Sequence, residues 1–325
     1  MCTSIALNSG AFYFGRNLDL EYRFGERVVI TPRNYPFSFR RSGGMKTHYA
    51  MIGMAAVTGG YPLYAEAANE CGLCMAGLNF PGNAFYPEKE AEGKVNLSPF
   101  ELIPCLLGRC ASVREARRAL QGIQLVRIDF SPSMPLTPLH WHIADKTESI
   151  VLEPMRDGLH IHDNPVGVMT NNPPFDFHMT NLNQYLSLTS GYPGNRMSGA
   201  LMLKPFGVGL GSFGLPGDFS PASRFVKTVF LKYNSRDDGS EAGGVSRFFH
   251  LLDAVAMPDG AVQTPDGKFE FTGYSCCMDA GKGIYYYKTY TNQALTAVHL
   301  HRADLDADCL YEYPLIREQQ IASAN

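Results

Sequence analysis

The sequence has no long apolar run and no excess of one charge. No stretch reaches the roughly 18 consecutive apolar residues that a membrane-spanning helix needs, and the N-terminal segment lacks the basic start and apolar core of a secretory signal. The 28 Lys and Arg residues against 31 Asp and Glu residues give a net charge of −3, which leaves no basic surface for nucleic acid or an anionic membrane. We therefore expect a soluble cytoplasmic protein whose partners include neither nucleic acid nor a membrane.

Cysteine is too sparse to build the fold. Eight cysteines in 325 residues do not make a disulfide framework, so we expect reduced thiols. Cys71 and Cys74 form a CxxC pair, but no second pair follows at zinc-finger spacing, and the apolar neighbours indicate a buried strand. Three His-x-His pairs, of which His140 and His142 are the first, lack carboxylates at matching spacing. Alternating strand polarity explains these pairs better than a metal site does.

The common catalytic signatures are also missing. Neither GxSxG, HExxH nor a P-loop occurs, which removes the usual support for a serine hydrolase, a zinc protease or a P-loop nucleotide hydrolase. The segment from Gly209 to Gly214 matches GxGxxG, but Pro216 and Gly217 stand where a dinucleotide-binding fold needs a helix. We interpret this segment as a glycine-rich loop.

Helices and strands occupy separate stretches of the chain. Ser98 and Ser112 each begin a capping box, and an apolar stripe of helical spacing follows Ser220, so helices are expected there and over 246–256. Strand-like runs occupy residues 27–31, 50–58, 73–80, 139–144, 149–153, 268–275, 283–289 and 294–300. This segregation favours an α+β fold over a parallel βαβ repeat, and we predict one domain over 1–325 because no linker divides the chain.

The N-terminal segment places a thiol at the start of a strand. Residues 3–7 and 12–16 have the pattern of a β-hairpin, and Cys2 precedes its first strand. Removal of Met1, which the small Cys side chain favours, would leave a free α-amine on Cys2. A thiol with a pKa of about 8.5 and an amine with a pKa of about 8 would combine nucleophile and base in one residue. The alternative is a cysteine that follows Met1 without any function.

Arg16 and Asp19 stand at the end of the second hairpin strand, so pairing would return both of them to Cys2. A cation near the thiol would favour the thiolate, and a carboxylate would hold the protonated amine in position. The residues alone are equally compatible with a surface ion pair.

Five ordered blocks are distributed over the whole chain. They are Met1-Cys-Thr-Ser, Phe14-Gly-Arg-Asn-Leu-Asp19, Gly77-Leu-Asn-Phe-Pro-Gly82, Thr170-Asn-Asn-Pro173 and Pro216-Gly-Asp-Phe-Ser-Pro-Ala-Ser-Arg224. Together they resemble the choloylglycine hydrolase family, whose members are bile salt hydrolases and penicillin V acylases with an N-terminal nucleophile. The similarity runs from Met1 to Tyr313-Pro314. It implies that Cys2 is the nucleophile with its own α-amine as the base, that Arg16 and Asp19 tune and orient it, and that Arg224 lies near the thiol.

The resemblance also implies an oxyanion hole and a type of substrate. The backbone N–H of Asn79 and the side-chain amide of Asn171 would be the donors, each worth roughly 3–4 kcal/mol, although turn chemistry beside prolines also explains both residues. Asn at position 79 is similar to bile salt hydrolases, whereas penicillin V acylases more often have Tyr there. A steroid substrate needs a broad apolar pocket. The candidate lining residues, each of which could equally belong to the core, are Leu18, Leu20, Tyr22, Phe24, Phe130, Met134 and Leu136.

The expected fold is therefore a four-layer αββα sandwich, and family resemblance implies a homotetramer without a metal or an organic cofactor. The expected reaction is hydrolysis of the amide bond of glycine- and taurine-conjugated bile acids through a cysteine thioester. Two alternatives stay open. The same chemistry could act on penicillin V or on N-acyl homoserine lactones, or the protein could bind bile acids or lipids without catalysis and need no free N-terminus.

Overall fold

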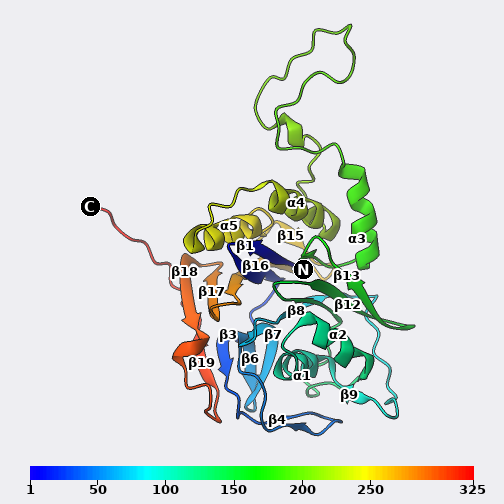
Figure 1. The fold of residues 1–325 in the computed structure, drawn as a ribbon, viewed down its shortest axis with the longest axis vertical. Helices are drawn as coiled ribbons and strands as arrows, with labels where there is room; N and C mark the ends of the chain where they lie inside the picture. The colour runs from blue at the N-terminus through cyan, green and yellow to red at the C-terminus, as the bar shows by residue number, and fades with distance from the viewer.

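Two β-sheets stacked face to face form the centre of the molecule, and helices cover the outer face of each sheet (Figure 1). The computed structural model describes residues 1–325. The buried apolar side chains form three clusters, with 29 residues between the sheets, 26 under the helices of one sheet and 9 under the helices of the other. Three cores between successive layers confirm the four-layer αββα sandwich that the sequence predicted.

The first sheet has seven strands and contains the N-terminal hairpin. Its strands are β1 (Cys2–Ser9), β2 (Ala11–Leu20), β14 (Val168–Met169), β15 (Val262–Gln263), β16 (Phe269–Asp279), β17 (Ile284–Thr289) and β18 (Asn292–His299). The order is β14-β1-β2-β16-β17-β18, with β15 paired to β16, and all pairs are antiparallel. The hairpin strands thus lie inside the sheet, which fixes their position from both sides.

The second sheet has eight strands in the order β13-β12-β11-β8-β7-β6-β3-β19. Their bounds are β3 (Arg27–Thr31), β6 (Met51–Thr58), β7 (Tyr61–Asn69), β8 (Cys74–Asn79), β11 (Leu139–Ala144), β12 (Ser149–Met155), β13 (Gly158–Asp163) and β19 (Tyr311–Pro314). Two short pairs stand apart, β4 (Phe37–Ser38) with β5 (Gly44–Met45), and β9 (Val95–Leu97) with β10 (Ile123–Leu125).

The helices form the two outer layers. The 3₁₀ turn η1 (Pro99–Glu101), α1 (Leu102–Arg109) and α2 (Val113–Gln121) belong to the eight-stranded side, and α4 (Pro221–Asn234) and α5 (Glu241–Asp253) to the seven-stranded side. The remaining elements are α3 (Phe175–Asn181), η2 (Leu182–Tyr185), η3 (Leu210–Ser212) and η4 (Leu300–Arg302). The serine caps explain several helix starts, because Ser112 and Ser220 each accept a hydrogen bond from a backbone N–H of the first turn.

Most predicted elements are present with shifted ends. Helix α5 begins at Glu241, before the predicted start at residue 246, because Ser240 caps it and accepts from the Gly243 N–H at 2.9 Å. A side chain at Gly244 would come within 2.7 Å of the Tyr13 ring, so glycine is needed where this helix crosses the sheet. The interpretation of Cys71 as part of a buried strand is wrong. It is exposed in the turn before β8, where Gly72 has a φ of +88°.

A long loop leaves the body of the molecule between α3 and α4 (Figure 1). Several of its large apolar side chains are exposed, including those of Leu186, Met202 and Phe206. The glycine-rich segment lies in this loop and forms only the short turn η3, as the sequence predicted. The structure contains no helix that is both long and apolar enough to span a membrane.

Candidate active site

Cys2 is buried between the two sheets at the start of β1. Its exposed fraction is 3%, and it belongs to the apolar cluster between the sheets. The hairpin register pairs Cys2 with Leu18 and Ser4 with Arg16, so the pairing brings the end of β2 back to the start of β1 as predicted. The Cys2 N–H donates to Oδ1 of Asn171 at 2.8 Å. Both the hairpin and the segment after β14 therefore position this residue.

Arg224, in the first turn of α4, spans the backbone of Cys2 and the Asn171 side chain. Its Nη1 donates to the Cys2 carbonyl and to Thr3 Oγ1, both at 2.5 Å, and its Nη2 donates to Asn171 Oδ1 at 2.9 Å. The side chain is buried, and burial lowers the pKa of the guanidinium while Asp19 and Cys2 oppose that shift. A buried cation thus lies directly beside Cys2.

Asn171 also connects the site to the second sheet. Its Nδ2 donates to the Asn79 carbonyl at 2.7 Å. Phe80 N–H donates to the Pro138 carbonyl, so residues 80 and 138 form a hydrogen-bonded pair of the β8–β11 ladder. Because such pairs alternate along an antiparallel ladder, Asn79 directs its N–H and its C=O away from β11. Both groups therefore face the side from which Asn171 approaches.

Two histidines hold the backbone of the Thr170–Asn171 segment. His140 Nε2 lies 3.0 Å from the Thr170 carbonyl, and His178 Nε2 lies 2.9 Å from the Asn171 carbonyl. Burial lowers the pKa of both imidazoles. The single N–H of a neutral His178 suits the Asn171 carbonyl, whereas His140 also has the Glu153 carboxylate 3.2 Å from its Nδ1.

Arg16 lies on the second strand of the hairpin and is buried between the two sheets. Its Nη1 donates to the Gly77 carbonyl at 2.5 Å and lies 3.7 Å from Oε2 of Glu66. Burial alone would lower the pKa of this guanidinium, but the negative groups around it, Cys2 foremost, raise it. The alternative of a surface ion pair between Arg16 and Asp19 is therefore wrong, because both side chains are at most 1% exposed.

Asp19 lies beside the chain terminus. The Met1 ammonium donates to the Asp19 carbonyl and to Glu270 Oε2, both at 2.7 Å, and the Asp19 N–H donates to the Met1 carbonyl at 2.9 Å. The Asp19 carboxylate accepts from Thr272 through Oδ1, whereas Oδ2 is buried and has no hydrogen-bond partner. One carboxylate oxygen beside the terminus is thus available to another donor.

The six predicted catalytic residues lie close together in the structure, whereas the predicted lining residues lie in different places. The six are Cys2, Arg16, Asp19, Asn79, Asn171 and Arg224. Leu18, Leu20 and Phe24 pack with the apolar cluster that contains Cys2, whereas Tyr22 is 57% exposed. The Phe130 ring contacts the rings of Phe100 and Tyr61 and the Arg40 guanidinium. Met134 and Leu136 are half-buried in the same loop. A lining role for these residues stays a prediction.

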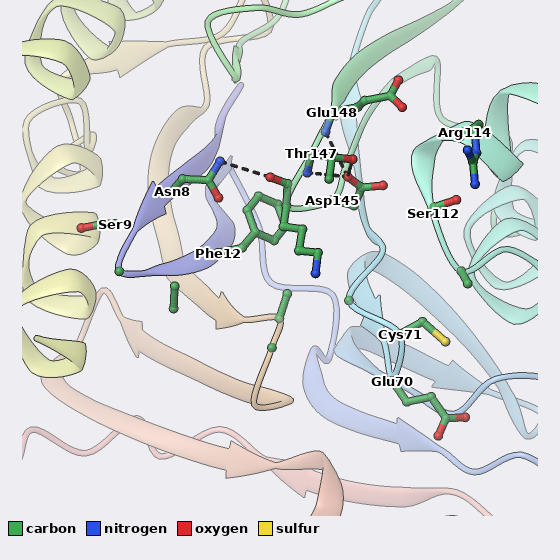
Figure 2. A pocket seen from close by; sticks show the side chains of 17 residues that line it. Asn8, Ser9, Phe12, Glu70, Cys71, Ser112, Arg114, Asp145, Thr147 and Glu148 are labelled. Carbon is green, nitrogen blue, oxygen red and sulfur yellow. Dashed lines mark hydrogen bonds between the residues drawn. The ribbon is translucent and has the colours of Figure 1, made fainter. Parts of the chain in front are cut away.

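A cavity of about 870 Å³ lies at the opposite end of the hairpin, around the Gly10 turn (Figure 2). Asn8 and Phe12 line it together with Arg114, and Asn8 Nδ2 donates to the Lys146 carbonyl at 3.4 Å. Seven residue steps along β1 separate Cys2 from Ser9, which amounts to roughly 20 Å in a strand. This cavity therefore does not contain Cys2.

Sequence reasoning missed several polar partners of the site, among them Glu66, Thr272 and Glu270. Thr272 and Glu270 lie on β16, which pairs with β2 and so lies beside Asp19, but such pairing between distant strands leaves no local pattern. Glu66 did leave a signal, because it is a single charged residue between apolar neighbours of a strand.

The comparison with protein families agrees with this arrangement. The family model described as linear amide C–N hydrolases, choloylglycine hydrolase family, matches residues 2–313. The chain belongs to this family. It is accordingly a hydrolase that acts on linear amide C–N bonds, and the resemblance found in the five sequence blocks is confirmed.

Individual relatives cover the whole chain. A bile salt hydrolase/transferase of Lactiplantibacillus plantarum is 50% identical over 325 residues, which is 100% of both chains. The crystal structure of a mutant conjugated bile acid hydrolase from Clostridium perfringens superposes with a TM-score of 0.93, at 38% identity and 100% coverage of each chain. A penicillin V acylase from Agrobacterium tumefaciens shares the fold with a TM-score of 0.75, at 19% identity over 98% of this chain and 94% of the acylase. The fold is thus that of the N-terminal nucleophile hydrolases.

Proposed function

We propose that this hydrolase cleaves the amide bond between a bile acid and glycine or taurine, with Cys2 as an N-terminal nucleophile after removal of Met1. The observation that carries the proposal is the closed set of contacts in which Asn171 and Arg224 hold both backbone groups of Cys2. Two relatives that are 38% and 50% identical are bile salt hydrolases, and this similarity and the Asn at position 79 support the bile acid substrate.

The first step uses the terminus that Met1 leaves behind. Without Met1, the Cys2 nitrogen becomes an α-amine that keeps its 2.8 Å contact with Asn171 Oδ1. This amine takes the proton of the Cys2 thiol, and the thiolate attacks the amide carbonyl carbon. Arg16 and Arg224 favour the thiolate because both are buried cations whose charge interacts with Cys2. Asp19 Oδ2, which lacks a partner, accepts from the protonated amine.

The second step stabilises and resolves the tetrahedral intermediate. The Asn171 amide has two N–H donors, so it can keep the Asn79 carbonyl and direct the second donor at the oxyanion. The Asn79 N–H faces the same side and serves as the other donor. The intermediate expels glycine or taurine as its nitrogen takes the proton of the α-ammonium, which leaves the acyl group on Cys2 as a thioester.

Hydrolysis of the thioester completes the cycle. The α-amine takes a proton from water, the hydroxide adds to the thioester carbonyl, and the bile acid leaves as the thiol is restored. No step requires a metal or an organic cofactor. Leu18, Leu20 and Phe24 supply the nearest apolar surface for the steroid, and the other predicted lining residues remain part of the proposal. We also propose that the protein is a cytoplasmic homotetramer. Light scattering of the purified protein would test the oligomeric state.

The test combines intact-mass analysis with a ninhydrin assay for glycine released from glycocholate, run beside penicillin V. We expect the loss of Met1 and rapid release of glycine. Loss of Met1 with activity on penicillin V alone would keep the nucleophile and overturn the substrate. Retention of Met1 without release would instead favour a protein that binds bile acids or lipids and does not cleave them.

A further inference from the structure

Glu66 is a buried carboxylate that the proposed reaction does not use. It lies on β7, is 0% exposed, and extends into the space between the sheets. Its Oε1 accepts from the Tyr285 hydroxyl at 2.6 Å and from the Tyr274 hydroxyl at 3.0 Å, and Tyr274 also reaches Oε2 at 2.8 Å. Two phenols of the opposite sheet thus hold this carboxylate. Burying a carboxylate costs free energy, which suggests that Glu66 has a further role.

A β-bulge directs Glu66 into this space. Tyr64 and Glu66 are two residues apart and would lie on the same face of a regular strand. The β6–β7 register instead pairs Met54 with Glu66 and Ala55 with Tyr64, which leaves Ala65 as an extra residue. Tyr64 therefore packs under α1 while Glu66 faces the other sheet. Bulges often re-aim a side chain beside an active site.

The same bulge provides part of the polar surroundings of the Arg16 guanidinium. The Arg16 Nη1 lies 3.7 Å from Glu66 Oε2, donates to the Gly77 carbonyl at 2.5 Å, and lies 3.4 Å from the carbonyl of the bulged Ala65. The guanidinium is buried and its charge interacts with Cys2 as well as with Glu66. Cys2 pairs with Leu18, two residues from Arg16, so the Cys2 and Arg16 side chains share the face of the first sheet that Glu66 approaches.

We propose that Glu66 is a positioning residue with two effects. It fixes the Arg16 guanidinium between the sheets, and its negative charge weakens the attraction of Arg16 for the Cys2 thiolate. This inference rests on the proposed role of Cys2 as the nucleophile. A buried guanidinium without a counter-charge is costly, and an Arg16 without one would attract the thiolate more strongly.

Charged and titratable side chains from both sheets and from α4 surround this space. Those of the first sheet and of α4 are Arg16, Asp19, Glu270, Tyr274, Cys276, Tyr285 and Arg224, and those of the second sheet are Glu66 and His140. Burial raises the pKa of Glu66, and Arg16 and the two phenols oppose the rise. Among these groups Glu66 is the one whose substitution by Gln removes a negative charge without removing the hydrogen-bond acceptor for the phenols.

The test measures the thiol directly in the full-length protein. The rate of Cys2 alkylation by iodoacetamide is followed against pH by mass analysis of the N-terminal peptide, which separates Cys2 from the other cysteines. Glu66→Gln should lower the midpoint of this profile by roughly half a pH unit or more, because removal of the negative charge stabilises the thiolate. The acidic limb of kcat/KM should move in the same direction.

Glu101→Gln is the matched control. Glu101 is also 0% exposed and accepts backbone hydrogen bonds from Ser98 and Arg40, but it lies in the outer helical layer. This variant should keep the midpoint of the parent. An unchanged or raised midpoint in Glu66→Gln would overturn the inference, even if the rate of turnover fell.

A second variant covers the case in which Glu66→Gln does not fold. Tyr285→Phe removes the shortest hydrogen bond to Glu66 and should lower the same midpoint by a smaller amount, since a less stabilised carboxylate is protonated more often. An unchanged midpoint in this variant would then overturn the inference. Because alkylation needs no substrate, a parent that fails to cleave glycocholate would refute the proposed substrate and leave this measurement intact.

Discussion

The two ends of the β1–β2 hairpin differ in the burial of their charged side chains. At the Cys2 end, Arg16 and Arg224 are buried and each has several polar partners. At the Gly10 end, a cavity of about 870 Å³ is lined by polar groups such as Arg114 and Glu148 that remain exposed to solvent (Figure 2). Buried charges with specific partners indicate chemistry, whereas the size of an open cavity does not.

Replacing the nucleophile should give the largest difference between the two ends. Cys2→Ala removes the sulfur that attacks the amide, so we expect the rate of glycine release from glycocholate to fall by at least roughly a thousandfold. The thermal unfolding midpoint should stay near that of the parent, because the change removes one atom from a strand that keeps its pairing. A variant with the parent rate would break the assignment of chemistry to this end.

Removal of the Asn171 side chain should have the next largest effect. Asn171→Ala removes one oxyanion donor and the acceptor that Cys2 and Arg224 share, so kcat should fall roughly 100- to 1000-fold. Asn172→Ala is the control in the same loop, because its side chain donates to the Pro81 carbonyl and not to Cys2. Steady-state kinetics with similar losses in both variants would show that the loop, and not the Asn171 amide, matters.

A stability measurement tests the region between the two ends. His142 bonds to Ser4 of β1, and burial lowers its pKa to about 3. The unfolded chain binds this proton near pH 6.5, so the stability that the neutral ring contributes is lost as the pH falls from about 6.5 toward 3. Between pH 7 and 5.5 the parent should lose about 1 kcal/mol more than His142→Gln. Urea unfolding of both proteins at the two pH values checks this, and equal losses would contradict it.

The smallest effect is expected at the open end. Arg114 is exposed on the wall of the cavity, and Arg114→Ala should leave kcat/KM within about twofold of the parent. The same assay with glycocholate measures it. A tenfold fall would mean that the cavity takes part in the reaction, and the contrast between the two ends would then need revision.

Local sequence signals predicted the elements that have a helix cap or a clear strand alternation. The caps at Ser112 and Ser220 located two helices, and strand alternation located the hairpin. Helix α3 (Phe175–Asn181) was missed because it is short and its N-cap position is Pro174, which has no side-chain acceptor. Strand β7 was missed because its Ala residues have low β-propensity and its alternation breaks at Ala65.

The residues of the candidate site likewise fall into those that local sequence signals predict and those that they do not. Cys2, Arg16 and Asp19 follow from hairpin pairing, which is local and can be derived from the sequence. Asn171 and Arg224 could be placed beside Cys2 only through the family resemblance, because more than 160 residues separate each from Cys2 in the chain. Glu66 shows the limit, since a single extra residue in a strand decides which face its side chain occupies.

The bulge in β7 makes the number of residues in that strand a functional property. Deleting Ala65 would make Tyr64 and Glu66 adjacent, so both side chains would keep their present faces, but Arg16 would lose the carbonyl that lies 3.4 Å from its Nη1. Insertions and deletions within Tyr61–Asn69 therefore belong with substitutions of the active site when related sequences are aligned or variant libraries are designed. A conserved composition in this strand would not guarantee a conserved site if its length changed.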